Sequence, residues 1–475
     1  MSVAAIKRIG LLGCALIVLP AAAQNPQGGP QAPHTAHPSG AGQEHAGTAG
    51  MPGPSIPMSA TDMYLMQQVS GTATNPASSS EGMFLKRIGS WTTMLHGVVS
   101  LNEMQQTGPR GGDKFFASNW FMGMAQRRAG AGSFLARAMV SLEPATVTKR
   151  RYPLLLQTGE TAFGRPIVDG QHPHDLVMEL GIQYARPIGE KTVLGLYLAP
   201  VGDPTLGPVA FPHRISAQEL PQAPLGHHVQ DSSHIANEVI TVGVTRGIVR
   251  LEASGFHGAE PNENRWNFDH GALDSWSSRL ALSPAKNWSG QVSVGRLKRP
   301  EAHGPDDIVR STASITYNKP LAMGFWASSF IWGRNHKTVA LRNINSYLAE
   351  SVLQFRQRNF LTGRVEWVDK DELLQNDHEA SEHAGLAEGS VFRVAAFTLG
   401  YTRSLGTFSG IELRLGGNFT IYRIPDALQP LYGERPASAL AHLRFRLKGR
   451  AGVHGVPGHA AASRSPGPPG PNVLQ

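Results

Sequence analysis

Apolar and polar residues alternate along most of the chain, between about residues 87 and 448. In one stretch the apolar positions are Ile411, Leu413, Leu415, Phe419 and Ile421, and in another they are Leu176, Met178, Leu180, Ile182 and Tyr184. Successive side chains of a β-strand point to opposite faces, so a period of two predicts strands with one apolar and one polar face. We therefore expect an all-β fold.

The alternation predicts sixteen strands, at residues 91–104, 115–128, 132–142, 176–186, 191–199, 237–246, 248–256, 277–283, 288–296, 309–318, 322–333, 350–358, 360–368, 391–403, 409–421 and 440–448. Short turns, such as those at 187–190 and 318–321, join many of these strands in pairs. The connections between pairs are longer, and they are expected at 143–175, 200–236, 257–276, 334–349 and 369–390.

Two all-β architectures fit alternating strands: a soluble sandwich or propeller, and a transmembrane barrel. A barrel needs apolar side chains toward lipid, polar ones toward the lumen, short turns at one rim and long loops at the other. Aromatic residues suited to the membrane interface lie at or near strand ends: Trp91, Trp120, Tyr184, Tyr197, Trp288, Tyr317, Trp332, Trp367, Tyr401 and Tyr422. The pattern therefore favours an antiparallel transmembrane β-barrel of about sixteen strands, an even number that allows the sheet to close.

The first 23 residues have the three parts of a secretory signal peptide. Lys7 and Arg8 precede a short apolar run, and Ala21-Ala22-Ala23 fits a cleavage site for small residues. A lipoprotein interpretation of Cys14 is weaker, because only about five apolar residues precede the cysteine. Beyond this segment no apolar run reaches the length of about 18 residues that a spanning helix needs.

Two terminal stretches lack the apolar residues needed to form a packed core. Residues 24–60 are rich in Pro, Gly and Ala and contain scattered His, and residues 449–475 are rich in Pro and Gly. Both are predicted to be disordered tails of a barrel at 87–448, with 61–86 as a short lead-in segment.

A signal peptide, glycine-rich amphipathic strands (53 of 475 residues are Gly) and alternating short and long connections together resemble Gram-negative outer-membrane β-barrel proteins of the porin type. The resemblance is architectural and covers about residues 87–448. It implies an outer-membrane location, with membrane lipid, the barrel assembly machinery and small solutes as partners. The chain differs from that pattern in the tail 449–475, which follows the last strand.

Charged residues on the polar strand faces are candidates for the lining of the lumen. They are Arg250, Arg364, Arg393, Arg414, Arg444, Arg446 and Lys448, with Glu179, Glu252, Glu366 and Glu412. These charges could cross-link a polar interior, or they could make a channel that favours anions. Without Lys7 and Arg8 the chain has 41 basic and 35 acidic residues, and no motif for nucleic acid accompanies this excess.

Histidines in the long connections are candidates for a metal site. The candidate ligands are His172, His174, Asp175, His213, His227, His228 and His234, and a further acidic group contains Asp377, His378, Glu379, Glu382 and His383. Imidazole and carboxylate suit copper or zinc, and the leader adds His34, His37, His45, Met51 and Met58. The alternative is that these are ordinary polar loop residues and that the protein has no cofactor.

The favoured function is an outer-membrane pore or transport channel for small anionic solutes, with 164–175 folded inward as a constriction. A first alternative is a metal-handling outer-membrane protein. A second is a soluble periplasmic metalloenzyme that uses His172, His174 and Asp175 as ligands. No G-x-S-x-G motif is present, and we do not expect an enzyme.

Overall fold

The computed structural model describes residues 59–448 except 81, 232–235, 303, 376, 378, 380, 383 and 384. The predicted signal peptide, the tail 449–475 and nearly all of the predicted linker 24–60 therefore lie outside the described residues. No helix in the described part of the chain is long and apolar enough to cross a membrane.

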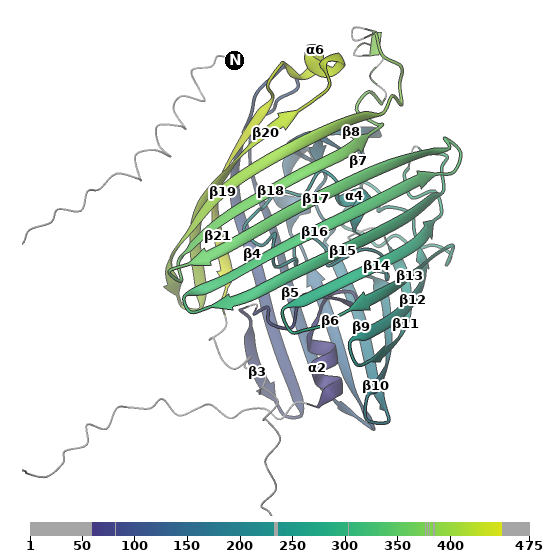
Figure 1. Cartoon of the computed structure of the whole chain (residues 1–475), viewed down its shortest axis with the longest axis vertical. Coiled ribbons are helices and arrows are strands. Elements are labelled where there is room, and N and C mark those ends of the chain that lie inside the picture. The colour runs from purple at the N-terminus through teal and green to yellow at the C-terminus, as the bar shows by residue number, and fades with distance from the viewer. Residues whose placement is uncertain are drawn as a thin grey trace, which may run out of the picture. The chain divides into compact units, whose positions relative to one another are not determined.

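Sixteen long antiparallel strands close into a barrel within the described residues (Figure 1). They are β4 (Trp91–Gln106), β5 (Lys114–Ala129), β6 (Gly132–Val140), β9 (Val177–Ile188), β10 (Thr192–Val201), β11 (Asn237–Arg246), β12 (Val249–His257), β13 (Ser275–Leu282), β14 (Trp288–Leu297), β15 (Ile308–Leu321), β16 (Gly324–Lys337), β17 (Arg342–Phe355), β18 (Asn359–Lys370), β19 (Phe392–Phe408), β20 (Ile411–Arg423) and β21 (Ala437–Leu447). The last strand, β21, pairs with β4, and the short β3 (Phe84–Ile88) pairs with the beginning of β4. The predicted fold is confirmed.

Each predicted strand corresponds to one of these sixteen, and the largest boundary error concerns β16 and β17. A long connection was predicted at 334–349, but the two strands continue as a hairpin and only 338–341 join them. Polar residues such as Asn343, Asn345 and Ser346 lie on both faces here, so the alternation disappears although the strand continues. Similarly, β15 runs through the turn predicted at 318–321 and ends at Leu321.

The two rims of the barrel differ as the sequence predicts. Turns of two to five residues at 130–131, 189–191, 247–248, 283–287, 322–323, 356–358 and 409–410 form one rim. The other rim carries most of the long connections, among them 258–274, 371–391 and 424–436, the last with η2 (Asp426–Leu428) and α6 (Gln429–Tyr432). In transmembrane barrels the short turns face the periplasm and the long loops face outward.

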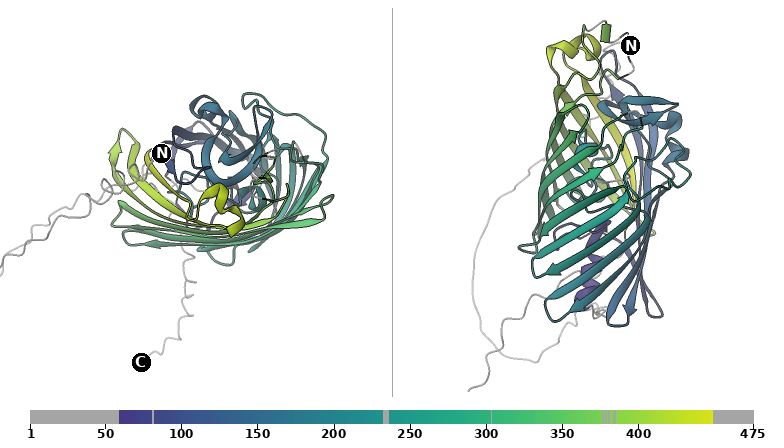
Figure 2. Two further views of the ribbon diagram at one scale, coloured as in Figure 1. Left: turned by 90° about the horizontal axis from the view of Figure 1, so that it is seen from above. Right: turned by 90° about the vertical axis from the view of Figure 1, so that its right-hand side faces the viewer.

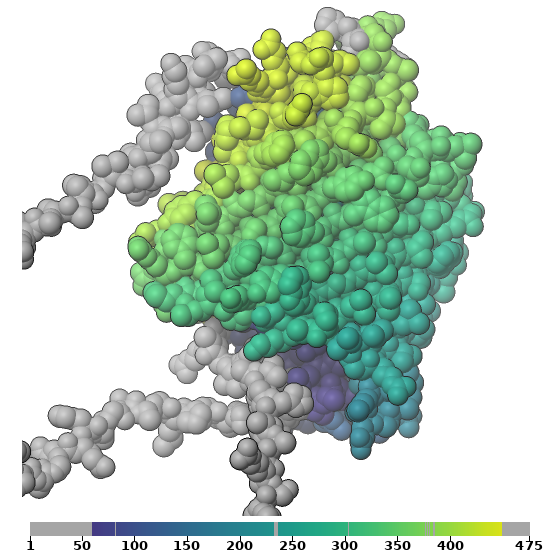
Figure 3. Space-filling model, in the orientation of Figure 1, coloured from purple at the N-terminus to yellow at the C-terminus, as the bar shows by residue number. Residues whose placement is uncertain are grey.

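The outer surface of the wall is apolar. Phe330 is 61% exposed and Leu399 is 65% exposed, whereas the strand neighbours Ser329 and Thr398 are buried inside. In the space-filling view the strands coloured teal to light green form a continuous surface (Figure 3). Such large apolar side chains would be unfavourable in water, and lipid is the environment that suits them.

Three segments lie inside the barrel, and the view from above shows blue ribbon within the ring of strands (Figure 2). The first is residues 59–80, named here the N-terminal plug, with α2 (Ala60–Met66), β1 (Gln68–Ser70) and β2 (Ala73–Thr74). The second is the inner hairpin of β7 (Tyr152–Ala162) and β8 (Arg165–Gln171), which follows α3 (Glu143–Thr146) and η1 (Thr148–Arg150). The third is the inward loop, residues 202–231, with α4 (His227–Gln230).

Candidate functional site

The N-terminal plug is held inside the barrel by wall side chains. Leu65 packs on Leu135 of β6, and Arg250 of β12 lies over the ring of Tyr64 at 4.5 Å. Arg137 of β6 donates a hydrogen bond to the carbonyl oxygen of Gln68 at 3.0 Å. The sequence indicated only a lead-in segment here, whereas the structure places it in the lumen.

Buried ion pairs hold the inward loop against the opposite wall. Arg214 of the loop pairs with Glu350 of β17 at 2.5 Å, and Arg364 of β18 pairs with the same carboxylate at 3.0 Å. Nearer the short-turn rim, the loop carboxylate of Glu219 is 1% exposed. Three wall arginines surround it: Arg414 in direct contact, Arg446 at 3.6 Å and Arg444 at 3.8 Å.

The structure places most of the predicted lumen charges on the inner face. Buried there are Arg250, Arg364, Arg414, Arg444, Glu179, Glu252, Glu366 and Glu412. Arg446 and Lys448 lie nearer the short-turn rim, where Lys448 is 3.3 Å from Glu412. Arg393 is the exception, because it lies on the outward face and pairs with Asp369 at 2.7 Å. Several of these charges hold the inward loop or the plug instead of bordering an open path.

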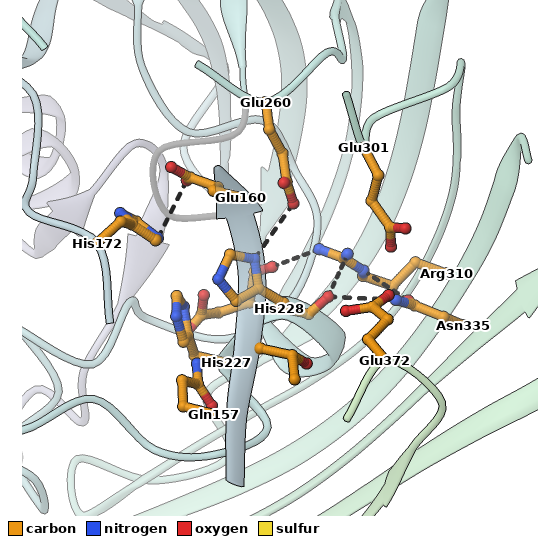
Figure 4. Close-up of polar contacts among 12 residues, drawn as sticks. Gln157, Glu160, His172, His227, His228, Glu260, Glu301, Arg310, Asn335 and Glu372 are labelled. Atoms are coloured by element: carbon orange, nitrogen blue, oxygen red, sulfur yellow. Dashed lines mark hydrogen bonds and ion pairs between the residues drawn. The ribbon is translucent and has the colours of Figure 1, made fainter. Parts of the chain in front are cut away.

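Three histidines from two of the inner segments meet in the lumen (Figure 4). His172 follows the inner hairpin, and His227 and His228 lie in α4. One ring nitrogen from each lies within 4.8 Å of the others. The carbonyl oxygen of His228 accepts hydrogen bonds from Arg310 of β15 and from Asn335 of β16, so the wall fixes the position of α4.

Carboxylates adjoin this cluster on two sides. Glu160 Oε1 of β7 lies 3.0 Å from His172 Nε2, and Glu260 Oε1 of the β12–β13 connection lies 3.2 Å from His228 Nδ1. Burial, together with Arg265, holds the pKa of His172 well below its usual value. Burial raises the pKa of Glu160 to about 7. Burial opposes protonation of His228 too, but the carboxylate of Glu260 outweighs it and raises the pKa of His228.

The other predicted metal ligands do not join the cluster. His174 pairs with Glu143 at 3.0 Å, Asp175 lies 3.6 Å from Arg265, and His213 lies against Trp120 with ring centroids 4.6 Å apart. His234, His378 and His383 lie outside the described residues. Conversely, sequence reasoning missed Glu160 and Glu260, which carry no local signal because only the fold brings them to the histidines.

A wide cavity of about 720 Å³, named here the outer vestibule, opens at the rim with the long connections. Its charged lining residues are Arg110, Lys114, Lys149, Arg151 and Arg165, with Asp113, Asp169 and Asp377. Arg110 pairs with Asp377 at 2.6 Å and with Asp169 at 3.4 Å, so two of the three carboxylates are already engaged. The excess charge of the vestibule is therefore positive.

No protein-family model matches the chain, and no curated protein matches it. Among solved structures, the anion-selective porin from Comamonas acidovorans shares 10% identity, covers 75% of this chain and 99% of its own, and gives a TM-score of 0.43. OprB from Pseudomonas putida, in a high-pH structure, shares 9% identity over 75% of this chain and 94% of its own, with a TM-score of 0.48. OmpF from Salmonella typhi, in complex with daunomycin, shares 7% identity over 76% of this chain and 100% of its own, with a TM-score of 0.46.

The closed sheet and the apolar outer surface decide the class of the protein. The chain is a sixteen-stranded outer-membrane β-barrel. The hypothesis of a soluble periplasmic metalloenzyme is wrong, because a soluble protein does not expose a belt of large apolar side chains around a closed barrel.

Proposed function

We propose that this barrel is a gated channel for small anionic solutes, closed by the segments inside its lumen. The proposal rests on the positive charge of the outer vestibule. A solute arriving from outside meets Lys114, Lys149 and Arg151, together with Arg165 on the inner hairpin itself. A cleft lined by one sign of charge raises the local concentration of solutes of the opposite sign.

Passage then requires the inner segments to move. The vestibule is wide, but an inner cavity beside Arg279 and Gly207 holds only about 20 Å³, and another beside Tyr64 holds about 10 Å³. These volumes are about the size of one water molecule or smaller. The ion pairs of Glu219 and Glu350 hold the inward loop to the wall, so releasing them is the step that would open a path.

Ion selectivity of the purified protein in planar lipid bilayers tests the proposal. At about 0.01 M salt, where the Debye length is roughly 30 Å, open events should favour anions. Replacing two vestibule charges together, Lys149→Gln and Arg165→Gln, should shift the reversal potential toward cations. Arg87→Gln, at the opposite rim, is the matched control and should leave the reversal potential almost unchanged. Open events that prefer cations at low salt in the unmodified protein would contradict the proposal.

A further inference from the structure

The ring orientations of His172 and His228 are fixed by oxygen atoms. Nδ1 of His172 contacts the carbonyl oxygen of Pro173 at 3.0 Å, and Nδ1 of His228 contacts Glu260 at 3.2 Å. These oxygens accept hydrogen bonds, so Nδ1 is the donor in each ring. In the neutral ring the other nitrogen, Nε2, then carries the lone pair, and neither Nε2 has a hydrogen-bond partner among the described residues.

We propose that His172, His227 and His228 bind one divalent transition-metal ion of the zinc or copper(II) class inside the lumen, with Glu160, which lies 3.0 Å from His172, as the adjoining carboxylate. A histidine whose Nδ1–H is held by a carboxylate or carbonyl oxygen is the common form of a metal-binding histidine. His227 lies in the same cluster, and its Nε2 donates a hydrogen bond to Gln171 Oε1 at 3.1 Å, which fixes the orientation of this ring too. Three imidazoles with a carboxylate suit such ions.

Unpartnered atoms within the cluster support an ion over a proton. Glu160 Oε1 and His172 Nε2 lie 3.0 Å apart, yet neither forms a hydrogen bond within the described part of the chain. A proton between them would satisfy that pair and leave His228 Nε2 without a partner. A cation bound by the three rings and the carboxylate would satisfy all of these atoms together.

The surroundings leave room for an ion and supply negative charge. Gly159 lies against His228, and a Cβ atom at Gly159 would be 2.8 Å from Nε2, so only glycine keeps this side open. A cavity of about 40 Å³ adjoins His228 and Glu260. Its charged lining residues are Glu260, Glu301, Asp369, Asp371 and Glu372, with Lys337 and Lys370. Five carboxylates against two lysines favour a cation.

A tetrahedral ion with bonds of about 2.1 Å would bring the ligand nitrogens to about 3.4 Å from one another. Because they now lie within 4.8 Å, the rings would draw together slightly on binding. The inference goes beyond the proposed channel, since an ion could bind whether or not the barrel conducts.

Titration of the metal-free full chain in detergent with ZnCl₂, and with CoCl₂ as a spectroscopic probe, tests the site. We expect one tight equivalent with the absorption of tetrahedral cobalt. His172→Gln or His228→Gln should abolish it, and Glu260→Gln should weaken it about 10- to 100-fold, because it removes the carboxylate that orients His228. His442→Gln, another buried histidine of the lumen, is the matched control and should bind like the unmodified chain.

The histidines of the leader require a second control. Replacing His34, His37 and His45 with Ala should leave the tight equivalent in place. No tight equivalent in the unmodified chain, its loss in this leader variant, or its survival in folded His172→Gln and His228→Gln variants would each overturn the proposal. If those variants fail to fold, X-ray absorption of the zinc-loaded leader variant decides: three imidazole ligands support the site, and fewer overturn it.

Discussion

Glu219→Gln should turn a barrel that opens rarely into a leaking one. The Glu219 carboxylate is the point where the inward loop meets Arg414, Arg444 and Arg446 of the wall. Glutamine keeps the size of the side chain and removes its charge. The three guanidinium groups would then have one carboxylate near them, that of Glu412 in the wall, which lies 2.7 Å from Arg414.

Removing one partner of a buried ion pair costs about 3–5 kcal/mol, because the remaining charge stays buried without its counter-ion. When the loop moves away, water can hydrate the three arginines, so the open arrangement does not bear this cost. The substitution therefore destabilises only the closed arrangement. Since about 1.4 kcal/mol corresponds to a factor of ten, the ratio of open to closed barrels should rise roughly 10²- to 4 × 10³-fold.

Conductance of the purified variant in planar bilayers measures this ratio, and heat-modifiable migration on gels shows that the barrel has folded. Glu238→Gln is the matched control: its exposed pair with His270 should contribute at most about 1 kcal/mol, and conductance should stay at the background level. A folded Glu219→Gln barrel that opens as rarely as the unmodified protein would refute the idea that this ion pair keeps the lumen closed.

Three further substitutions or deletions test the architecture. Leu399→Arg should reduce membrane assembly, because arginine toward lipid costs about 2–4 kcal/mol near the bilayer centre, whereas Thr398→Ser on the inner face of the same strand should assemble normally. Leu65→Ala should loosen the N-terminal plug by about 2–5 kcal/mol, measured as faster cleavage by a protease added from the short-turn side; unchanged cleavage would contradict the packing of Leu65. Deleting 24–58 should leave a heat-modifiable barrel that opens as rarely as the unmodified protein, whereas deleting 24–80 should make it conduct. Equal behaviour of the two would argue against the plug.

The strands could be predicted because lipid and lumen impose a strict alternation on each of them. The prediction fails where that constraint is absent. In the β16–β17 hairpin, polar residues lie on both faces of the outer end. In β9, Met178 was assigned to the lipid face, but the register shift between Met139 and Val140 of β6 turns both Met178 and Glu179 inward. A β-bulge of this kind cannot be recognised from the alternation of apolar and polar residues.

The closed lumen was predicted only in part: an inward fold was expected at 164–175, which overlaps β8, whereas the N-terminal plug and the inward loop were not expected. One further signal exists. Residues 152–156 form an uninterrupted apolar run, Tyr-Pro-Leu-Leu-Leu, in which Leu155 and Leu156 are fully buried. Such a run is typical of a strand covered on both faces, which fits a hairpin inside a barrel better than a loop outside it. The sequence identified the histidines as candidate ligands, but it could not show which of them lie together. Only the fold brings His172, His227 and His228 together and places His174 and His213 elsewhere.

Metal binding and closure of the lumen are physically linked if both proposals hold. The ligands come from the inner hairpin and the inward loop, so a bound ion ties two of the closing segments to each other. An ion that binds only the closed arrangement stabilises it by about 2.7 kcal/mol at a concentration of 100 times Kd. Zinc at that concentration should therefore lower the conductance of Glu219→Gln roughly 100-fold, and a chelator should restore it. Adding His228→Gln should remove this response, whereas inhibition by zinc that survives in the double variant would indicate simple blocking of the pore.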